Sequence, residues 1–209
     1  MLNHNFQPKG LRSGLGWYDR GYIPHFEAGE TAQFLTFRLF DSLPAAVVEK
    51  WREETDADEA GRVKFRKNIE NYLDKGFGSC FLKDARIGEL IEDGLFFHAG
   101  SKYELAAWVV MPNHLHFLAT PRAGVELAEI AHSIKSYTAH EANKLLRRRG
   151  QFWQHEPFDR YIRSRRHYAN VVRYIENNPV KARLCESAAE WRFSSAYYKA
   201  QAKSEEPIK

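Results

Sequence analysis

The sequence predicts an α+β protein of the ferredoxin-like, split βαβ type, with a mainly antiparallel sheet, helices on one face and an extra helix near the C-terminus. Residues 33–40 (QFLTFRLF) alternate between two sets of side chains, as a strand does. Residues 103–110 (YELAAWVV) and 114–120 (HLHFLAT) read as two strands joined by a short turn, which makes a hairpin. Helical patterns separate these strands, and the order strand, helix, strand, strand, helix, strand, helix is typical of this fold.

The helical segments repeat apolar residues at spacings of three and four, which places these residues on one face of a helix. In the last segment we expect Pro179 to end the helix, because proline lacks an N–H and disfavours the helical conformation of the residue before it. The predicted helices cover residues 42–75 with a break near 55–61, and residues 83–98, 125–146 and 166–178, and residues 152–162 are expected to be extended.

The chain has 209 residues, which fit one domain with elaborations, and 44% of them are hydrophobic, enough to bury a core. Residues 1–30 are rich in Gly, Pro, His and aromatic residues and are expected to form an irregular N-terminal arm. The domain then covers 31–183, and 184–209 form a C-terminal tail. No apolar run suits a signal peptide or a membrane span, and Cys80 and Cys185 have no CxxC partner, so we expect a cytoplasmic protein with reduced thiols.

Positive charge is concentrated in one part of the chain. The formal net charge is only +4, but residues 147–173 contain eight arginines. The acidic residues in this stretch are Glu156 and Asp159. Such a local excess can neutralise the phosphates of a nucleic acid, although a solvated helix face would show the same excess. The eight are Arg147, Arg148, Arg149, Arg160, Arg163, Arg165, Arg166 and Arg173.

His114 and His116 lie two residues apart on a predicted strand, so both imidazoles project from one face while Leu115 projects from the other. This spacing lets one metal ion take a nitrogen from each ring. A His-x-His pair by itself is also compatible with packing. The apolar residues on both sides predict a central strand, where two histidines need a partner such as a metal or an acid.

Tyr174 and Asn178 are four residues apart on the last predicted helix and therefore share a face, while Val171 and Ile175 give this helix its packing surface. Asn178 sits at the expected helix end, where its side chain is free to reach a ligand. The spacing alone favours a half-buried aromatic residue and a C-terminal cap over a functional pair.

Four segments follow one another between Trp108 and Ser195: V-V-M-P-N-H-L-H-F-L, W-Q-H-E-P-F-D-R-Y-I-R, R-Y-I-E-N-N-P-V-K-A-R-L and W-R-F-S-S. This ordered set resembles the REP-associated tyrosine transposases, which belong to the HUH single-tyrosine transposases. Residues 20–44 fit the same family more loosely. In this family the tyrosine follows the histidine pair, as it does here, and the fold is ferredoxin-like.

The resemblance implies a catalytic site. Tyr174 would be the nucleophile on a catalytic helix, and His114 and His116 would bind a divalent metal. Asn178 would fill a third ligand position that is Gln in many relatives. Relatives use Mg²⁺ or Mn²⁺, although imidazoles would also suit zinc. The implied activity is cleavage and rejoining of single-stranded or hairpin DNA through a 5′-phosphotyrosine link, by a nucleoid-associated monomer or homodimer without a membrane partner.

The implied substrates are repetitive extragenic palindromes, which are short DNA hairpins with flanking single strands. Cationic side chains would bind their phosphates, and an aromatic side chain would stack on unpaired bases. Trp153 and Phe158 are the two stacking candidates, and core packing is the alternative for every aromatic residue. The expected nucleic-acid contacts are Lys135, Arg147, Arg148, Arg149, Trp153, Arg163, Arg165 and Arg166.

Three alternative functions stay open. A non-catalytic module that binds DNA or RNA hairpins predicts stacking aromatic residues on the central strands, where this chain has His114 and His116. A zinc hydrolase often adds Asp-His soon after His-x-His, but Phe117 and Leu118 stand there. A transposase that binds DNA without cutting it would carry the same motifs.

Overall fold

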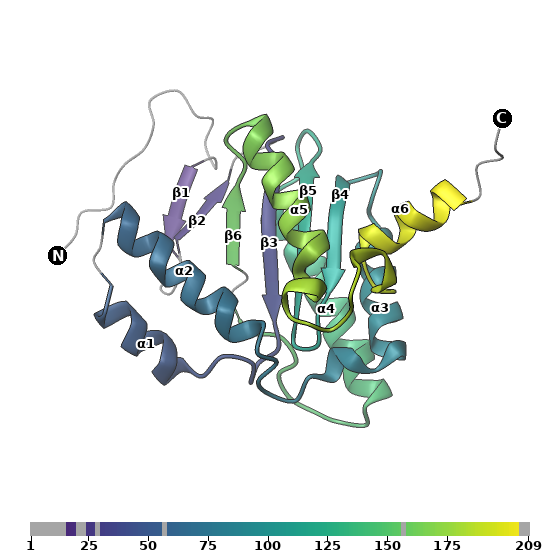
Figure 1. Ribbon diagram of the computed structural model, residues 1–209, viewed down its shortest axis with the longest axis horizontal. Coiled ribbons are helices and arrows are strands. Elements are labelled where there is room, and N and C mark those ends of the chain that lie inside the picture. The colour runs from purple at the N-terminus through teal and green to yellow at the C-terminus, as the bar shows by residue number, and fades with distance from the viewer. Residues whose placement is uncertain (1–15, 20–23, 28–29, 56–57, 156–157, 205–209) are drawn as a thin grey trace.

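A four-stranded antiparallel sheet in the order β4-β5-β3-β6 forms the centre of the protein (Figure 1). The computed structural model describes residues 16–19, 24–27, 30–55, 58–155 and 158–204. The strands are β3 (Gln33–Arg38), β4 (Tyr103–Val110), β5 (His114–Pro121) and β6 (Phe158–Tyr161). The β4–β5 hairpin and the central place of β5 confirm the α+β fold that the sequence predicts.

Three helices cover the sheet: α3 (Ala85–Phe96), α4 (Leu127–Leu145) and α5 (Arg165–Lys181). Because alternate side chains of a strand point to opposite faces, β3 supplies two cores. Leu35 and Phe37 pack with α3 and α4, whereas Phe34 packs with α5. Figure 1 accordingly shows α5 in front of the strands and α4 behind them. Helix α5 therefore covers the face of the sheet opposite to the face that α3 and α4 cover.

A helical hairpin lies between β3 and α3 in the chain. It consists of α1 (Ala45–Glu53) and α2 (Glu59–Leu73). The break expected near residues 55–61 falls between them. The carboxylate of Asp58 begins α2 by accepting a hydrogen bond from the backbone N–H of Gly61 at 2.7 Å. The hairpin has a small core of its own, formed by Leu43, Val48, Ile69 and Leu73.

Helix α5 does not end before Pro179, and this part of the sequence prediction is wrong. The helix continues to Lys181, with Ala182 as its C-cap, whose N–H donates to the carbonyl of Asn178 at 2.9 Å. A proline in the last turn removes only its own N–H, and the hydrogen bonds beyond it can still form. The backbone N–H of Leu184 donates to the carbonyl of Pro179 at 2.9 Å and extends this last turn.

Both ends of the chain contain regular structure. In the region expected to be an irregular arm, β1 (Gly16–Asp19) pairs with β2 (Pro24–Glu27), while 1–15, 20–23 and 28–29 lie outside the described residues. The region expected to be a tail includes the 3₁₀ turn η2 (Ala188–Glu190) and helix α6 (Ser195–Ser204), folded onto the edge of β4. No helix in the described ranges is long and apolar enough to cross a membrane.

Candidate active site

His114 and His116 lie on β5, in the middle of the sheet, and both project toward α5. Strand β5 pairs with β3 on one side and β4 on the other, so neither histidine is near a sheet edge. The two side chains are 0% and 1% exposed, and their ring centroids are 4.5 Å apart. Leu115 and Phe117 pack into the core on the other face, as the alternation in the sequence predicts.

One nitrogen of each imidazole is held by a neighbouring side chain. His114 Nδ1 lies 2.7 Å from Asn113 Oδ1, and the amide nitrogen of Asn113 donates to the carbonyl of Phe77 at 2.9 Å. Asn113 Oδ1 is thus an acceptor, so His114 Nδ1 carries the proton and Nε2 carries a lone pair. His116 Nδ1 is hydrogen-bonded to Thr36 Oγ1, across the strand pair, at 2.8 Å. Both Nε2 atoms are buried and have no hydrogen-bond partner.

Burial keeps both imidazoles neutral. It lowers the pKa of His114 to about 3, and the nearby charges of Arg38 and Lys181 act in the same direction. Burial also lowers the pKa of His116 well below its usual value, with His114, Lys181 and Arg160 adding to the effect. Neutral imidazole is the form that binds a metal ion, because the ligand nitrogen must be unprotonated.

Helix α5 places Tyr174 opposite this pair. Its N-cap, Ser164, accepts a hydrogen bond from the backbone N–H of His167, and Val171 and Ile175 pack into the core shared with β4 and β5. This packing turns Tyr174 toward the sheet, where its ring centroid lies 5.5 Å from that of His116. The fold therefore brings the tyrosine close to the histidine pair, although they lie far apart in the sequence.

The hydroxyl of Tyr174 is buried and makes no hydrogen bond that satisfies normal geometry. Burial raises the pKa of this phenol above its ordinary value, and the carboxylates of Glu70 and Asp74 raise it further. The side chains of Asn178 and Arg160 act in the opposite direction. The phenol is thus protonated in this state of the protein.

Asn178 completes a group of buried polar atoms that lack partners. Its side chain is 0% exposed, and neither its oxygen nor its nitrogen makes a hydrogen bond. An unpartnered buried polar group costs about 1–3 kcal/mol. An ordered water, a bound ion or a functional role accounts for such groups in folded proteins. The C-terminal cap that spacing favoured for Asn178 is wrong, because α5 continues beyond it and Ala182 is the cap.

The donor set fits a divalent metal ion. Two imidazole nitrogens and one amide oxygen, from His114, His116 and Asn178, are all buried and unpartnered. Among the described residues, no group of three His, Cys, Asp or Glu side chains could hold a metal. A third protein ligand beside the histidine pair would therefore be the amide oxygen of Asn178, and other ligand positions would remain for substrate or water.

Lys181 is a site residue that sequence reasoning missed. Its ammonium lies 5.7 Å from the centroid of the Tyr174 ring and 2.7 Å from the carboxylate of Asp74, the C-cap of α2. Lys181 follows Tyr174 by seven residues, which is about two helical turns, and so lies on the same side of α5. Because we expected Pro179 to end the helix, this relationship could not be recognised from the sequence.

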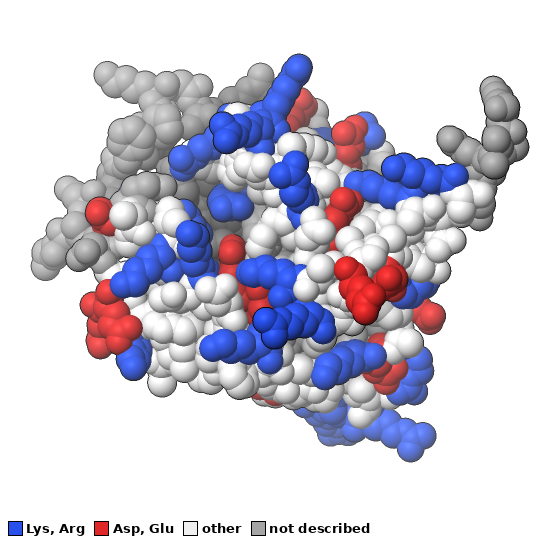
Figure 2. All heavy atoms as spheres, in the orientation of Figure 1, with Lys and Arg blue, Asp and Glu red and all other residues white. Residues whose placement is uncertain are grey.

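An open groove of about 350 Å³ runs beside the tyrosine and is lined by Asn170, Arg173, Tyr174, Asn177 and Lys181. Figure 2 views the protein from the α5 side and shows many Lys and Arg side chains on this face, with a few Asp and Glu among them. This face can therefore attract a polyanion next to the phenol.

The arginine-rich stretch divides into two groups. Arg147, Arg148 and Arg149 follow α4, on the layer behind the sheet, and line a second groove of about 510 Å³ with His140 and Lys144. The other three predicted arginines surround the start of α5, on the layer of Tyr174, and all three are exposed. The group at the start of α5 comprises Arg163, Arg165 and Arg166. The chain crosses from one layer to the other between the two groups, so the groups lie on different layers of the protein.

Arg148 has a structural role within its group. Its guanidinium lies 5.1 Å from the centroid of the Phe40 ring and 5.0 Å from that of Phe81. It also donates a hydrogen bond to Asn143 Oδ1 at 2.8 Å. Arg147 and Arg149 are exposed and remain available to a ligand.

Trp153 is a core residue, and the expectation that it stacks on a base is wrong. Its side chain is only 4% exposed, lies against Phe37 and donates a hydrogen bond from Nε1 to Thr138 Oγ1 at 2.9 Å. The other stacking candidate, Phe158, has a side chain outside the described part of the structure. Lys135 donates from its ammonium to the backbone carbonyl of His155 at 2.7 Å, which holds it against the segment before β6.

Comparison with known proteins agrees with this geometry. Residues 90–178 match the family described as "Transposase IS200 like". A REP-associated tyrosine transposase of Escherichia coli (strain K12) is 31% identical over 94 residues, which make up 44% of this chain and 54% of that protein. The match thus spans about half the length of this relative.

A solved structure of a REP-associated tyrosine transposase bound to a REP hairpin has a similar fold, with a TM-score of 0.51 and 21% sequence identity. The superposition covers 91% of this chain and 87% of that one. The matched family segment contains the histidine pair, Tyr174 and Asn178. Residues 90–178 of this chain are therefore similar to the IS200-like transposases, and the resemblance of the chain to the REP-associated tyrosine transposases is confirmed.

Proposed function

We propose that this protein is a metal-dependent, transposase-like endonuclease and strand transferase that cleaves and rejoins single-stranded or hairpin DNA of the REP type through Tyr174. One observation carries the proposal: the phenol and the two free imidazole nitrogens are buried together with an unpartnered amide. The relationship to the IS200-like transposases and the hairpin bound to the similar solved structure support the choice of substrate.

His114, His116 and Asn178 would hold a divalent cation, Mg²⁺ or Mn²⁺. When bound, such a cation polarises the scissile phosphate and spreads the negative charge that develops on it. The residues of the chain prepare this site. The hydrogen bonds that the Nδ1 atoms make with Asn113 Oδ1 and Thr36 Oγ1 fix the orientation of both rings and leave both Nε2 atoms without a hydrogen-bond partner.

Tyr174 would act as the nucleophile. A bond forms between its phenolic oxygen and phosphorus while the bond from phosphorus to the 3′ oxygen breaks. The phenol loses a proton and the leaving 3′ oxygen gains one, so the step is balanced. The 5′-phosphotyrosine conserves the energy of the phosphodiester, and a 3′-OH can reverse the step and join new ends. Burial raises the pKa of the phenol, so the nucleophile must lose its proton as it attacks.

The cationic side chains of the α5 layer would bind the strand that reaches Tyr174. Arg163, Arg165 and Arg166 are exposed there, and Arg173 and Lys181 line the groove beside the phenol. Arg147 and Arg149 would bind more distant phosphates, such as those of a hairpin stem. One chain contributes the tyrosine and both histidines, so a single copy has every residue that the reaction uses. The DNA substrate would place the protein in the cytoplasm, at the nucleoid.

A covalent adduct tests the proposal. Purified protein is mixed with an end-labelled single-stranded hairpin oligonucleotide and Mn²⁺ or Mg²⁺, and the products are separated on a denaturing gel. Wild type is expected to form a protein–DNA adduct that a chelator abolishes. Tyr174→Phe is expected to bind the hairpin and form none. Tyr168→Phe, which changes an exposed tyrosine of the same helix, is the matched control.

Binding without any adduct, with either cation, would contradict the enzymatic proposal. It would favour a protein that recognises DNA hairpins without cutting them. Equal adduct formation by wild type and Tyr174→Phe would instead contradict the assignment of the nucleophile.

A further inference from the structure

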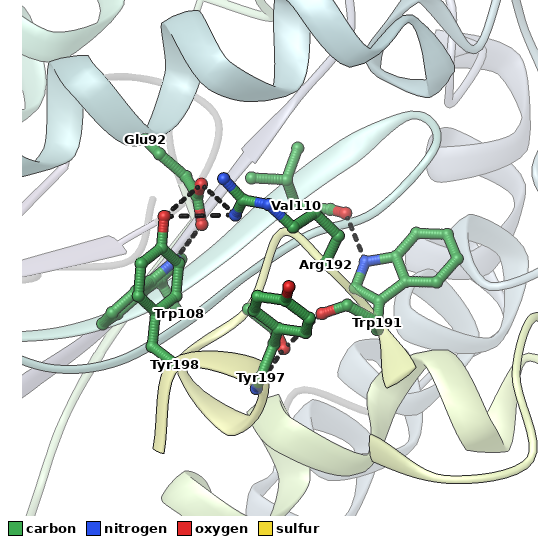
Figure 3. Close-up of polar contacts among 8 residues, drawn as sticks. Glu92, Trp108, Val110, Trp191, Arg192, Tyr197 and Tyr198 are labelled. Atoms are coloured by element: carbon green, nitrogen blue, oxygen red, sulfur yellow. Dashed lines mark hydrogen bonds and ion pairs between the residues drawn. The ribbon is translucent and has the colours of Figure 1, made fainter. Parts of the chain in front are cut away.

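The motif W-R-F-S-S, residues 191–195, has no part in the chemistry described above, yet it is bound closely to the sheet. Strand β4 is an edge strand, and the motif occupies its free edge. The backbone N–H of Val110 donates to the carbonyl of Phe193 at 2.9 Å. Trp191 Nε1 donates to the carbonyl of Val110 at 2.9 Å (Figure 3). Ser194 forms a β-bridge with Val109. The motif is thus an added segment of the sheet.

A buried carboxylate anchors the helix that follows. Glu92 of α3 is 3% exposed and accepts hydrogen bonds from Trp108 Nε1 at 2.9 Å, from Arg192 at 3.1 Å and from the hydroxyl of Tyr198 at 3.1 Å. Figure 3 shows these side chains converging on Glu92 from β4 and from the start of α6. Three donors satisfy the buried charge, and they fix the C-terminal segment to α3 and β4.

From this anchored segment, Ser195 reaches the catalytic helix. Its side chain is 1% exposed and accepts a hydrogen bond from the backbone N–H of Trp108 at 3.3 Å. Its hydroxyl donates to Glu176 Oε1 of α5 at 2.9 Å. Lys199 of α6 donates to the same oxygen at 2.6 Å. Ser195 and Lys199 therefore tie Glu176 to the edge of β4.

The contacts of Ser195 and Lys199 with Glu176 act on the side of α5 that faces away from the phenol. Glu176 follows Tyr174 by two residues, which is about 200° around a helix of 3.6 residues per turn. A tether on that flank opposes rotation of α5 about its axis. With side-chain tips about 5–6 Å from the axis, a rotation of roughly 20° would move the phenol by about 2 Å. Misplacement of about 1 Å can cost on the order of 10²-fold in rate.

We infer that Ser195 and Glu176 are positioning residues, which set the rotation of α5 and so hold Tyr174 in line with the histidine pair. This inference rests on the proposed function. It assigns the W-R-F-S-S motif and the glutamate of Y-I-E-N-N-P to one task, the orientation of the nucleophile, with no contact to DNA or metal.

The test uses the full chain and measures four quantities: the single-turnover rate of adduct formation, the Kd for the hairpin, the Tm, and hydrogen exchange of the α5 backbone amides. Ser195→Ala and Glu176→Ala are expected to slow the adduct at least about 10-fold and to speed exchange at residues 171–178, with Kd within about two-fold of wild type. The double variant should be no slower than Glu176→Ala, because Glu176→Ala already removes the hydrogen bond that Ser195→Ala removes, together with the contact of Lys199.

Two variants separate positioning from general destabilisation. Glu176→Gln keeps an acceptor for Ser195 and is expected to retain most of the rate. Ser187→Ala removes a hydrogen bond that caps η2 in the same segment but leaves the Ser195–Glu176 hydrogen bond in place, and it should leave the rate and the α5 exchange unchanged. Unchanged α5 exchange in Ser195→Ala and Glu176→Ala would overturn the inference, as would a loss of rate that only parallels the Tm. If wild type formed no adduct, the proposed function would fail, whereas the exchange data would still decide whether the pair holds α5.

Discussion

The phenol of Tyr174 lies against the imidazole of His116, with 5.5 Å between ring centroids and 57° between ring planes. The two residues come from different elements, α5 and β5, and nothing near either residue in the sequence specifies the contact. The core around Val171 and Ile175 sets it by packing α5 onto the sheet. Metal binding, stability and catalysis should all depend on this relationship.

Divalent cations should bind at His114, His116 and Asn178. In titration calorimetry with Mn²⁺, we expect His116→Ala to abolish binding and Asn178→Ala to weaken it. Thr36→Val removes the hydrogen bond to His116 Nδ1 and should weaken binding about 10–100-fold, because such partners orient the ligand ring. His140→Ala alters an exposed histidine of α4 and serves as the control. Equal affinity in His116→Ala and wild type would place the cation elsewhere.

Without a divalent cation, the buried histidines should make stability depend on pH. The folded pKa of His114 is lowered to about 3 from 6.5, so acid protonates the unfolded chain first. This contribution is complete above pH 6.5 and is lost as the pH falls toward 3. Between pH 6.5 and 5 it amounts to about 2 kcal/mol for His114. His116 acts in the same direction.

Urea unfolding in the presence of a chelator, at pH 7 and pH 5, measures this dependence. His114→Gln should unfold with a smaller difference between the two pH values than wild type, whereas His140→Gln should match wild type. The same difference in His114→Gln and wild type would show that His114 titrates normally in the folded protein.

Lys181 should contribute to the chemical step. Its ammonium lies beside the Tyr174 ring, where it can stabilise the charge of the phenol oxygen and of the attacked phosphate. We expect Lys181→Met to slow adduct formation about 10–100-fold, and Lys181→Arg to retain more of the rate. Single-turnover assays at saturating hairpin measure the effect without interference from binding. Lys83→Met, an exposed lysine remote from α5 in the sequence, is the control, and equal rates for all three variants would exclude a role for the ammonium.

The two arginine groups should differ in their effect on a short single strand. Arg163→Ala and Arg166→Ala, on the layer of Tyr174, are each expected to weaken its binding and to lower the slope of log K against log salt by about 0.7. Arg147→Ala and Arg149→Ala, behind the sheet, should leave both quantities unchanged. Fluorescence anisotropy at several salt concentrations makes the comparison. A reduced slope for the Arg147 and Arg149 variants would mean that the strand follows the other layer.

Periodicity explains how much of the fold was predictable. Strands β3, β4 and β5 and helices α1 to α5 follow from local apolar patterns, and so does the shared face of His114 and His116. The helix end predicted at Pro179 is wrong because a helix tolerates proline in its last turn. Rules based on the local sequence place the helix end before such a proline. That error hid Lys181, which α5 brings onto the Tyr174 side two turns later.

Relationships between layers could not be predicted in this way. The arginines form one run in the sequence, but the crossing between α4 and α5 divides them. Trp153 stands in a polar, basic stretch and yet pairs with Leu39 in a β-bridge, which places it in the core. The contacts of Glu176 with Ser195 and Lys199 join α5 to the C-terminal segment through tertiary packing alone.

The most direct measurement identifies the residue that carries DNA after cleavage. The adduct made with Mn²⁺ and a hairpin oligonucleotide is digested with a protease and a nuclease, and its peptides are sequenced by mass spectrometry. We predict a nucleotide phosphate on the peptide that contains Tyr174, bonded to that tyrosine. A nucleotide on Tyr161 or Tyr168, with Tyr174 unmodified, would contradict a catalytic role for Tyr174.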